Sequence, residues 1–82
     1  MKLDENGNIV PLSDELTAIS HAIRNRRRLL KLNQDDLAEL AGISQRYLYS
    51  IETGQANPSL ETLIKIIDVL GLRIEIKLKS AK

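Results

Sequence analysis

The amino-acid sequence predicts a mainly α-helical domain of four helices, followed by a C-terminal β-strand. Apolar residues recur at helical spacing over most of the chain, and residues that cap helices stand just before the apolar runs. Near the C-terminus the period changes, and apolar and charged residues alternate strictly over 72–78. This pattern divides the 82 residues into an N-terminal arm or small hairpin (1–12), a helical domain (13–71) and a dimerisation strand with a short tail (72–82).

The N-terminal arm carries a hairpin pattern and leads into the first helix. Asn6-Gly7 is the preferred centre of a two-residue turn, which would bring Leu3 opposite Val10. The first helix is predicted to begin after Ser13, which would cap it. Its predicted buried stripe consists of Leu16, Ile19, Ile23 and Leu30.

Two short helices joined by a tight turn are predicted at 34–41 and 45–52. Asn33 and Asp36 can form a capping box for the first helix, and Ser44 can cap the second. Gly42 supplies the left-handed residue between them, and Gly54 ends the segment. The predicted buried residues are Leu37, Ala38, Leu40, Ala41, Leu48 and Ile51. This is a helix-turn-helix pattern, which points to DNA recognition.

A fourth helix is predicted between Ser59, its cap, and Gly71, its end. Its predicted apolar face consists of Leu60, Leu63, Ile64, Ile67 and Leu70. The strand that follows has the apolar residues Leu72, Ile74, Ile76 and Leu78.

A single strand needs a partner for its backbone and its apolar face. The partner could be the N-terminal hairpin or the same strand of a second copy, and both pairings can occur together. A two-fold antiparallel pair would bring Arg73 and Lys77 of each copy near Glu75 of the other. We therefore favour a homodimer held by this strand.

Composition limits the classes of function. The net charge is only +1, but Arg24, Arg26, Arg27, Arg28 and Lys31 give the first helix a basic end. With no cysteine and no apolar run of the ~20 residues that span a bilayer, we expect a cytoplasmic protein without membrane contact. The only histidine is expected at the surface, and no catalytic, cofactor or metal motif is present, so we predict no enzyme. A protein-interaction adaptor remains a third class.

The ordered motifs resemble the lambda-repressor-like (Xre) DNA-binding domains from about Leu16 to Gly71. They are Ile23-Arg24-x-x-Arg27, Leu32-Asn33-Gln34-x-x-Leu37-Ala38, Ala41-Gly42-Ile43-Ser44, Ile51-Glu52-x-Gly54 and Asn57-Pro58-Ser59. The run Leu-Gly-Leu-Arg-Ile-Glu-Ile at 70–76 is similar to HipB-type antitoxins, in which such strands pair between subunits. The resemblance implies a prokaryotic repressor, associated with the nucleoid when bound to a palindromic operator in double-stranded DNA. It also implies a toxin partner, a kinase in HipA-type systems; a stand-alone Xre-type, phage-like regulator is the alternative.

The resemblance and side-chain chemistry together select the candidate DNA contacts. Base reading is assigned to Gln45, Arg46, Tyr49 and Ser50, because glutamine pairs with adenine and arginine with guanine. A phosphate contact or plain exposure is the alternative for Arg46. Contacts to the DNA backbone are assigned to Gln34, Ser44, Tyr47, Thr53, Gln55, Asn57, Arg24 and Arg28. The resemblance also implies that Arg27 and Glu52 form a structural ion pair between the first helix and the recognition helix.

Overall fold

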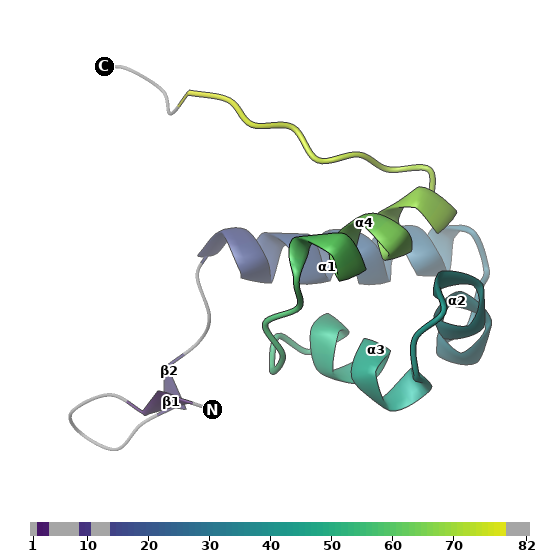
Figure 1. Ribbon diagram of the computed structural model, residues 1–82, viewed down its shortest axis with the longest axis horizontal. Coiled ribbons are helices and arrows are strands. Elements are labelled where there is room, and N and C mark those ends of the chain that lie inside the picture. Colours follow the sequence, from purple (N-terminus) through teal and green to yellow (C-terminus); the bar gives the residue numbers. More distant parts are fainter. Residues whose placement is uncertain (1, 4–8, 11–13, 79–82) are drawn as a thin grey trace.

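The computed structural model describes residues 2–3, 9–10 and 14–78. Its elements are β1 (Lys2–Leu3), β2 (Ile9–Val10), α1 (Asp14–Leu29), α2 (Gln34–Ala41), α3 (Gln45–Glu52) and α4 (Leu60–Val69). Figure 1 shows α2 and α3 on the side of the domain away from the C-terminal segment, with α4 in front of α1 in this view. The four predicted helices are confirmed, and α2 and α3 have the predicted bounds.

Local capping explains why the helices begin and end where they do. The Asn33 side chain accepts a hydrogen bond from the Asp36 N–H at 2.7 Å, and the Asp36 carboxylate accepts one from the Asn33 N–H at 3.3 Å. Ser44 and Ser59 each accept from the N–H three residues on, at 3.0 and 3.1 Å. Gly42 ends α2 in the left-handed conformation with φ 75°. These caps confirm the predicted boundaries inside the helix-turn-helix; the predicted cap at residue 13 lies outside the described residues.

The turn after α1 corrects the predicted buried stripe of that helix. The helix ends at Leu29, and Lys31 then adopts a left-handed φ of 62°, which is unusual for a residue other than glycine. This turn rotates Leu30 away from the core, and its side chain is 41% exposed. Leu32 packs against the core in its place.

The core lies between the four helices, where α2 contacts both α3 and α4 and α1 contacts α3. Its buried apolar residues are Ile23, Leu37, Ala38, Ala41, Leu48, Ile51, Leu63, Ile66, Ile67 and Leu70. The buried Ser20 hydroxyl on α1 donates to the Ile51 carbonyl at the end of α3 at 2.7 Å, which fixes these two helices to each other.

The exposed side of α4 differs from the prediction. Leu60 and Ile64 are 62% and 43% exposed, whereas Ile66, which was not assigned to the core, is fully buried. Five of the ten residues of α4 are leucine or isoleucine, so helical spacing alone allows more than one apolar face. Packing against α2 selects the face that contains Ile66. The prediction for Leu40 on α2 was also wrong, since that side chain is 62% exposed.

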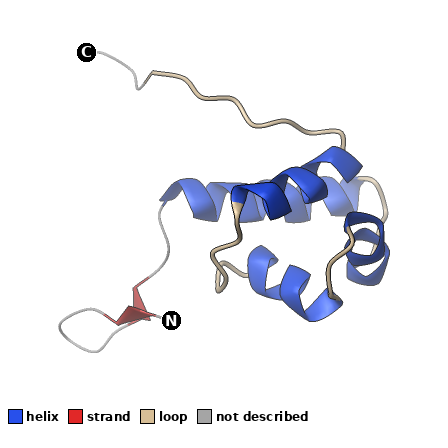
Figure 2. Ribbon diagram, in the orientation of Figure 1, coloured by secondary structure: helices blue, strands red, loops and turns tan. Residues whose placement is uncertain are grey.

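The two ends of the chain also depart from the simplest expectation. β1 and β2 pair antiparallel with Leu3 opposite Ile9, so the predicted Leu3–Val10 pairing is wrong by one residue. The predicted Asn6-Gly7 turn lies outside the described residues. The C-terminal segment 72–78 runs as an extended chain without strand pairing (Figures 1 and 2).

The segment 72–78 pairs with no other strand among the described residues, which is the physical reason that the predicted strand is not formed there. The sheet of the described residues consists of β1 and β2 alone, so pairing of the C-terminal segment with the N-terminal hairpin is not observed. Pairing between two copies stays a prediction. Within the described part of the chain, no helix combines the length and the apolar character needed to cross a bilayer.

Candidate nucleic-acid interface

The outer face of α3 presents polar side chains opposite its two buried apolar residues. Leu48 and Ile51 are fully buried, while Gln45, Arg46 and Tyr49 are exposed. A helix with one face in the core and a polar face in solvent has the shape required to enter a major groove. The structure therefore places three of the four predicted base-reading residues on one accessible surface.

A buried ion pair joins α1 to the end of α3, as predicted. Arg27 donates from Nε to Glu52 Oε2 at 2.7 Å and from an Nη atom to Glu52 Oε1 at 2.9 Å. Another Nη atom donates to the Leu32 carbonyl at 2.9 Å, so the same guanidinium holds the turn after α1. Both residues are nearly inaccessible, with 8% of Arg27 and 2% of Glu52 exposed. The paired carboxylate raises the pKa of Arg27 against the opposing effect of burial, so the guanidinium stays protonated at all physiological pH values.

The ion pair continues into a hydrogen-bond chain that reaches the exposed start of α3. Gln34 donates from Nε2 to Glu52 Oε1 at 3.1 Å, and Gln45 donates from Nε2 to Gln34 Oε1 at 2.6 Å. We call the four residues Arg27, Glu52, Gln34 and Gln45 the glutamine relay. The sequence analysis predicted the ion pair between Arg27 and Glu52, but it did not predict the hydrogen bonds that connect this pair to the two glutamines.

The relay fixes the orientation of the side-chain amide groups of Gln34 and Gln45. An ionised carboxylate can only accept, so Gln34 must turn its NH2 group toward Glu52 and its oxygen toward Gln45. Gln45 must then turn its own NH2 group toward Gln34. This leaves Gln45 with its carbonyl oxygen and a second N–H for a ligand, one acceptor and one donor side by side.

Four other predicted contact residues have structural partners within the domain. Ser44 caps α3, and the Tyr47 ring is half-buried against the core. The half-buried Ser50 donates to the Arg46 carbonyl at 3.2 Å, and the Thr53 hydroxyl donates to the Tyr49 carbonyl at 2.9 Å. These hydroxyls retain acceptor lone pairs for a DNA contact, and that assignment stays a prediction.

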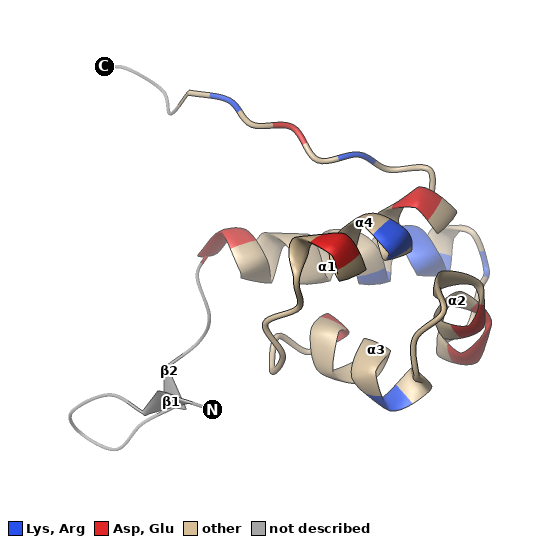
Figure 3. Cartoon of the chain, viewed as in Figure 1, with Lys and Arg blue, Asp and Glu red and all other residues tan. Residues whose placement is uncertain are grey.

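The remaining predicted backbone contacts follow the end of α3 or lie on α1. Gln55, Asn57 and Arg28 are exposed. Arg24 is partly buried, and its Nε is enclosed without a hydrogen-bond partner in the described residues. Figure 3 shows a cluster of basic residues on the second half of α1, with acidic residues at its start and on α2, and further basic residues on α3, α4 and the C-terminal segment. The positive charge is therefore local on a nearly neutral chain.

One arginine of the basic run has a structural role that the sequence reading missed. Arg26 donates from Nε to the Leu70 carbonyl at 2.9 Å, which joins α1 to the end of α4. The last carbonyls of a helix lack partners within the helix, so a nearby arginine is a natural donor to them. This tendency of basic residues to bind the last carbonyls of a helix could have suggested such a contact, but it does not say which arginine of the run makes it.

Comparison with known proteins places the chain among transcriptional regulators. The family model described as Helix-turn-helix (HTH_3) matches residues 23–77. An HTH-type transcriptional regulator of Methanocaldococcus jannaschii is 35% identical over 57 residues, which cover 70% of this chain and 86% of that protein. An HTH-type regulator of Haemophilus influenzae is 42% identical over 50 residues, 61% of this chain and 51% of that one. The chain thus spans about half the length of the latter. The immunity repressor of Bacillus phage phi105 is 39% identical over 56 residues, 68% of this chain and 39% of the repressor.

Solved structures agree with this assignment. The restriction-modification controller protein C.AhdI from Aeromonas hydrophila superposes with a TM-score of 0.69 at 30% identity, covering 74% of this chain and 92% of the controller. The biofilm regulator SinR, solved in complex with DNA, gives a TM-score of 0.63 at 38% identity and covers 67% and 89% of the two chains. The chain belongs to the Xre-type helix-turn-helix family of DNA-binding transcriptional regulators.

Proposed function

We propose that this regulator represses transcription as a homodimer on a palindromic operator, with α3 in the major groove and Gln45 reading a base. The glutamine relay is the observation that supports this most directly. It orders an exposed side chain at the first turn of α3 through bonds that begin at a buried ion pair.

The relay also favours one base. The free carbonyl oxygen of Gln45 matches the N6 amino group of adenine, and its free N–H matches adenine N7. Guanine offers acceptors at both corresponding positions, so it would oppose the Gln45 oxygen. We therefore propose adenine as the base that Gln45 reads, with Arg46, Tyr49 and Ser50 contributing to neighbouring positions.

Selection from a random duplex library, followed by titration, tests base reading. The selected sites should be palindromes whose half-sites lie about one helical turn, or roughly 34 Å, apart. Gln45→Ala should weaken binding to the selected site by about 1–3 kcal/mol and binding to random DNA much less. Equal losses on both duplexes would show that Gln45 only positions the protein.

The backbone contacts are proposed for Gln34, Ser44, Tyr47, Thr53, Gln55, Asn57, Arg24 and Arg28. Among these, Arg28 is the simplest to test because its side chain is exposed and forms no hydrogen bond or ion pair with the described residues. Arg28→Ala should weaken binding to all sequences alike and reduce the slope of log K against log salt concentration by about one. An unchanged slope would remove Arg28 from the contact surface.

Dimerisation is proposed to use the terminal strand, residues 72–78. Ile76 is 95% exposed in the single chain, and its placement on an alternating segment suits a strand-to-strand contact. Ile76→Asp should dissociate the dimer in sedimentation experiments and lower operator affinity, because a monomer engages one half-site. An intact dimer would place the interface elsewhere on the molecule.

The finer proposal is that the protein is the antitoxin and autorepressor of a toxin–antitoxin pair, in which the toxin resembles HipA-type kinases. It rests on the similarity of residues 70–76 to HipB-type antitoxins. The relatives described above, a phage immunity repressor and a restriction-modification controller, favour the stand-alone alternative. Co-expression with the adjacent gene separates the two: rescue of growth and co-purification support the antitoxin, and the absence of both leaves a stand-alone repressor.

A further inference from the structure

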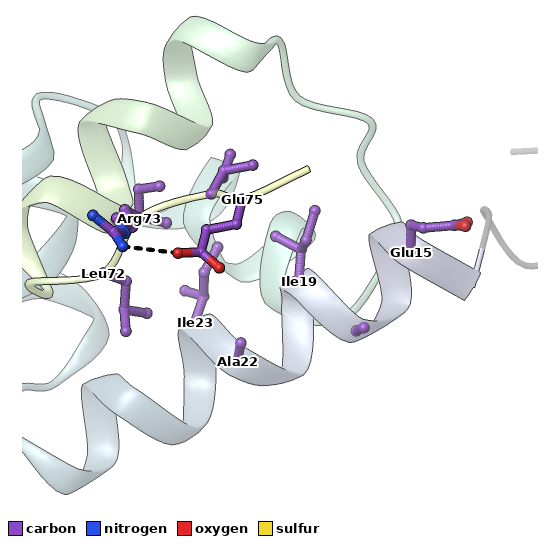
Figure 4. A pocket seen from close by; sticks show the side chains of 10 residues that line it. Glu15, Ile19, Ala22, Ile23, Leu72, Arg73 and Glu75 are labelled. Atoms are coloured by element: carbon purple, nitrogen blue, oxygen red, sulfur yellow. Dashed lines mark hydrogen bonds and ion pairs between the residues drawn. The ribbon is translucent and has the colours of Figure 1, made fainter. Parts of the chain in front are cut away.

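An apolar groove of about 460 Å³ lies between α1 and the segment that follows α4. Its apolar lining includes Ile19, Ala22, Ile23, Ile67, Leu72 and Ile74. Figure 4 shows Glu15 at one end of the groove and the paired Arg73 and Glu75 side chains on the segment above α1. In a single chain this apolar surface is open to solvent.

The segment that forms the upper edge of the groove has exposed apolar side chains and backbone groups without partners among the described residues. Ile76 and Leu78 are 95% and 98% exposed, and Ile74 is 41% exposed. Beyond Leu72, no backbone–backbone hydrogen bond joins residues 73–78 to any other described residue. An extended chain with free backbone groups and exposed apolar side chains is a template for another strand.

We propose that the groove is closed by the same segment of a second copy, which runs antiparallel with Ile74 on the two-fold axis. This inference rests on the proposed strand dimer and adds the pairing register and the surface that the partner strand covers. Ile76 of each copy would then lie opposite Leu72 of the other, which is partly buried against the core and lines the groove. The residues that face one another are on the same side of the sheet, so Ile76 is brought to the groove.

Several antiparallel registers would keep the apolar residues of both strands on one face of the sheet. The charges of the residues between them favour the register with Ile74 on the axis. With Ile74 on the axis, Arg73 of each copy faces Glu75 of the other, which makes two attractive pairs. With Glu75 on the axis, the two Glu75 carboxylates would face each other and Arg73 would face Lys77, so like charges would oppose each other. With Ile76 on the axis, Glu75 would face Lys77, but Arg73 would face Lys79, so attractive and repulsive pairs would offset each other, and Leu72 would face the polar Ser80.

The Arg73–Glu75 arrangement already exists within one chain, where the two side chains are 2.8 Å apart and exposed. A test of the register must therefore separate contacts within a copy from contacts between copies. Mixing two single charge-reversal variants does this, because like charges remain within each copy while opposite charges meet between copies.

The experiment is sedimentation equilibrium on the full chain without DNA. Arg73→Glu and Glu75→Arg should each raise the dimer dissociation constant roughly tenfold or more. An equimolar mixture of the two variants should form heterodimers with a dissociation constant near that of the unmodified protein. A mixture as weak as its components overturns the register, as does a tighter dimer for Arg73→Glu alone, which is the result expected with Glu75 on the axis.

Filling the groove tests the surface that the partner strand covers. Ala22→Gln should weaken the dimer by a similar factor because a longer side chain from α1 enters the groove, whereas Asn25→Gln on an exposed position outside the groove should not. If Ile76→Asp dissociates the dimer and Ala22→Gln does not, the groove assignment is overturned while the strand dimer stands. If Ile76→Asp leaves the dimer intact, the strand dimer itself fails. Since no DNA is present, neither result depends on base reading.

Discussion

Removing Gln34 should separate two roles that are proposed for this side chain. In the free protein Gln34 orients Gln45 through a 2.6 Å hydrogen bond, and its position at the start of α2 also makes it a candidate phosphate contact. Orientation of Gln45 matters only on the operator, whereas a phosphate contact contributes on any duplex. Gln34→Ala should therefore reduce both the overall affinity and the preference for the operator.

The expected magnitudes follow from the contacts. The substitution removes two hydrogen bonds, but Glu52 keeps both bonds from Arg27, so the free energy of unfolding should fall by only about 1 kcal/mol. A released glutamine side chain has up to about 2 kcal/mol of rotamer entropy to lose on binding. The folded surface still restricts part of this rotamer freedom before DNA binds, so only the remainder is lost on binding. We therefore expect a loss of about 1 kcal/mol in operator preference beyond the uniform loss on random DNA.

A double-mutant cycle measured by titration on operator and random duplexes tests this reasoning. In the Gln45→Ala background there is no side chain left to orient, so the combined effect of Gln34→Ala and Gln45→Ala should be less than additive by about 1 kcal/mol on the operator. Gln55→Ala is the matched control, because this exposed glutamine lies outside the relay and its effect should add fully. Full additivity of Gln34→Ala with Gln45→Ala would refute the orienting role.

Three further predictions concern stability and are measured by thermal or denaturant unfolding. Arg27→Ala should destabilise the domain by about 3–5 kcal/mol because it leaves the buried Glu52 carboxylate without its ion-pair partner. Arg28→Ala, at an exposed position, should change stability by less than about 1 kcal/mol. Similar melting temperatures for the two variants would contradict the structural role of Arg27. Ile66→Ala should cost about 2–5 kcal/mol and Ile64→Ala much less, and the reverse order would mean that the other face of α4 is buried. Arg26→Ala should cost about 1–3 kcal/mol, since it leaves a carbonyl at the end of α4 without its charged donor; an unchanged melt would contradict that contact.

The helix boundaries could be predicted because the residues that set them act locally. Asn33, Gly42 and Ser44 each satisfy or redirect backbone groups within a few residues, so their effect is visible in the sequence itself. The buried face of α4 could not be predicted in the same way. Ile64 and Ile66 are both apolar, and only contact with α2 decides which of them enters the core.

The candidate site shows the same division between local and long-range information. The exposure of Gln45 and Arg46 follows from the periodicity of α3, which could be read directly. The link from Gln45 to Glu52 could not, because it passes through Gln34 on another helix and depends on how α2 and α3 are packed. The C-terminal segment is a further case, since its alternation predicts a strand but no described residue of the chain pairs with it.

The glutamine relay also has a consequence for the kinetics of operator binding. Gln45 is already held in place in the free protein, so encounter with the correct site requires no search among side-chain conformations before the groove contact forms. The association rate should then be set by diffusion, by orientation of the two surfaces and by attraction between the basic end of α1 and DNA. Discrimination between operator and near-operator sequences should therefore appear in the dissociation rate, as the residence time of the regulator on each site.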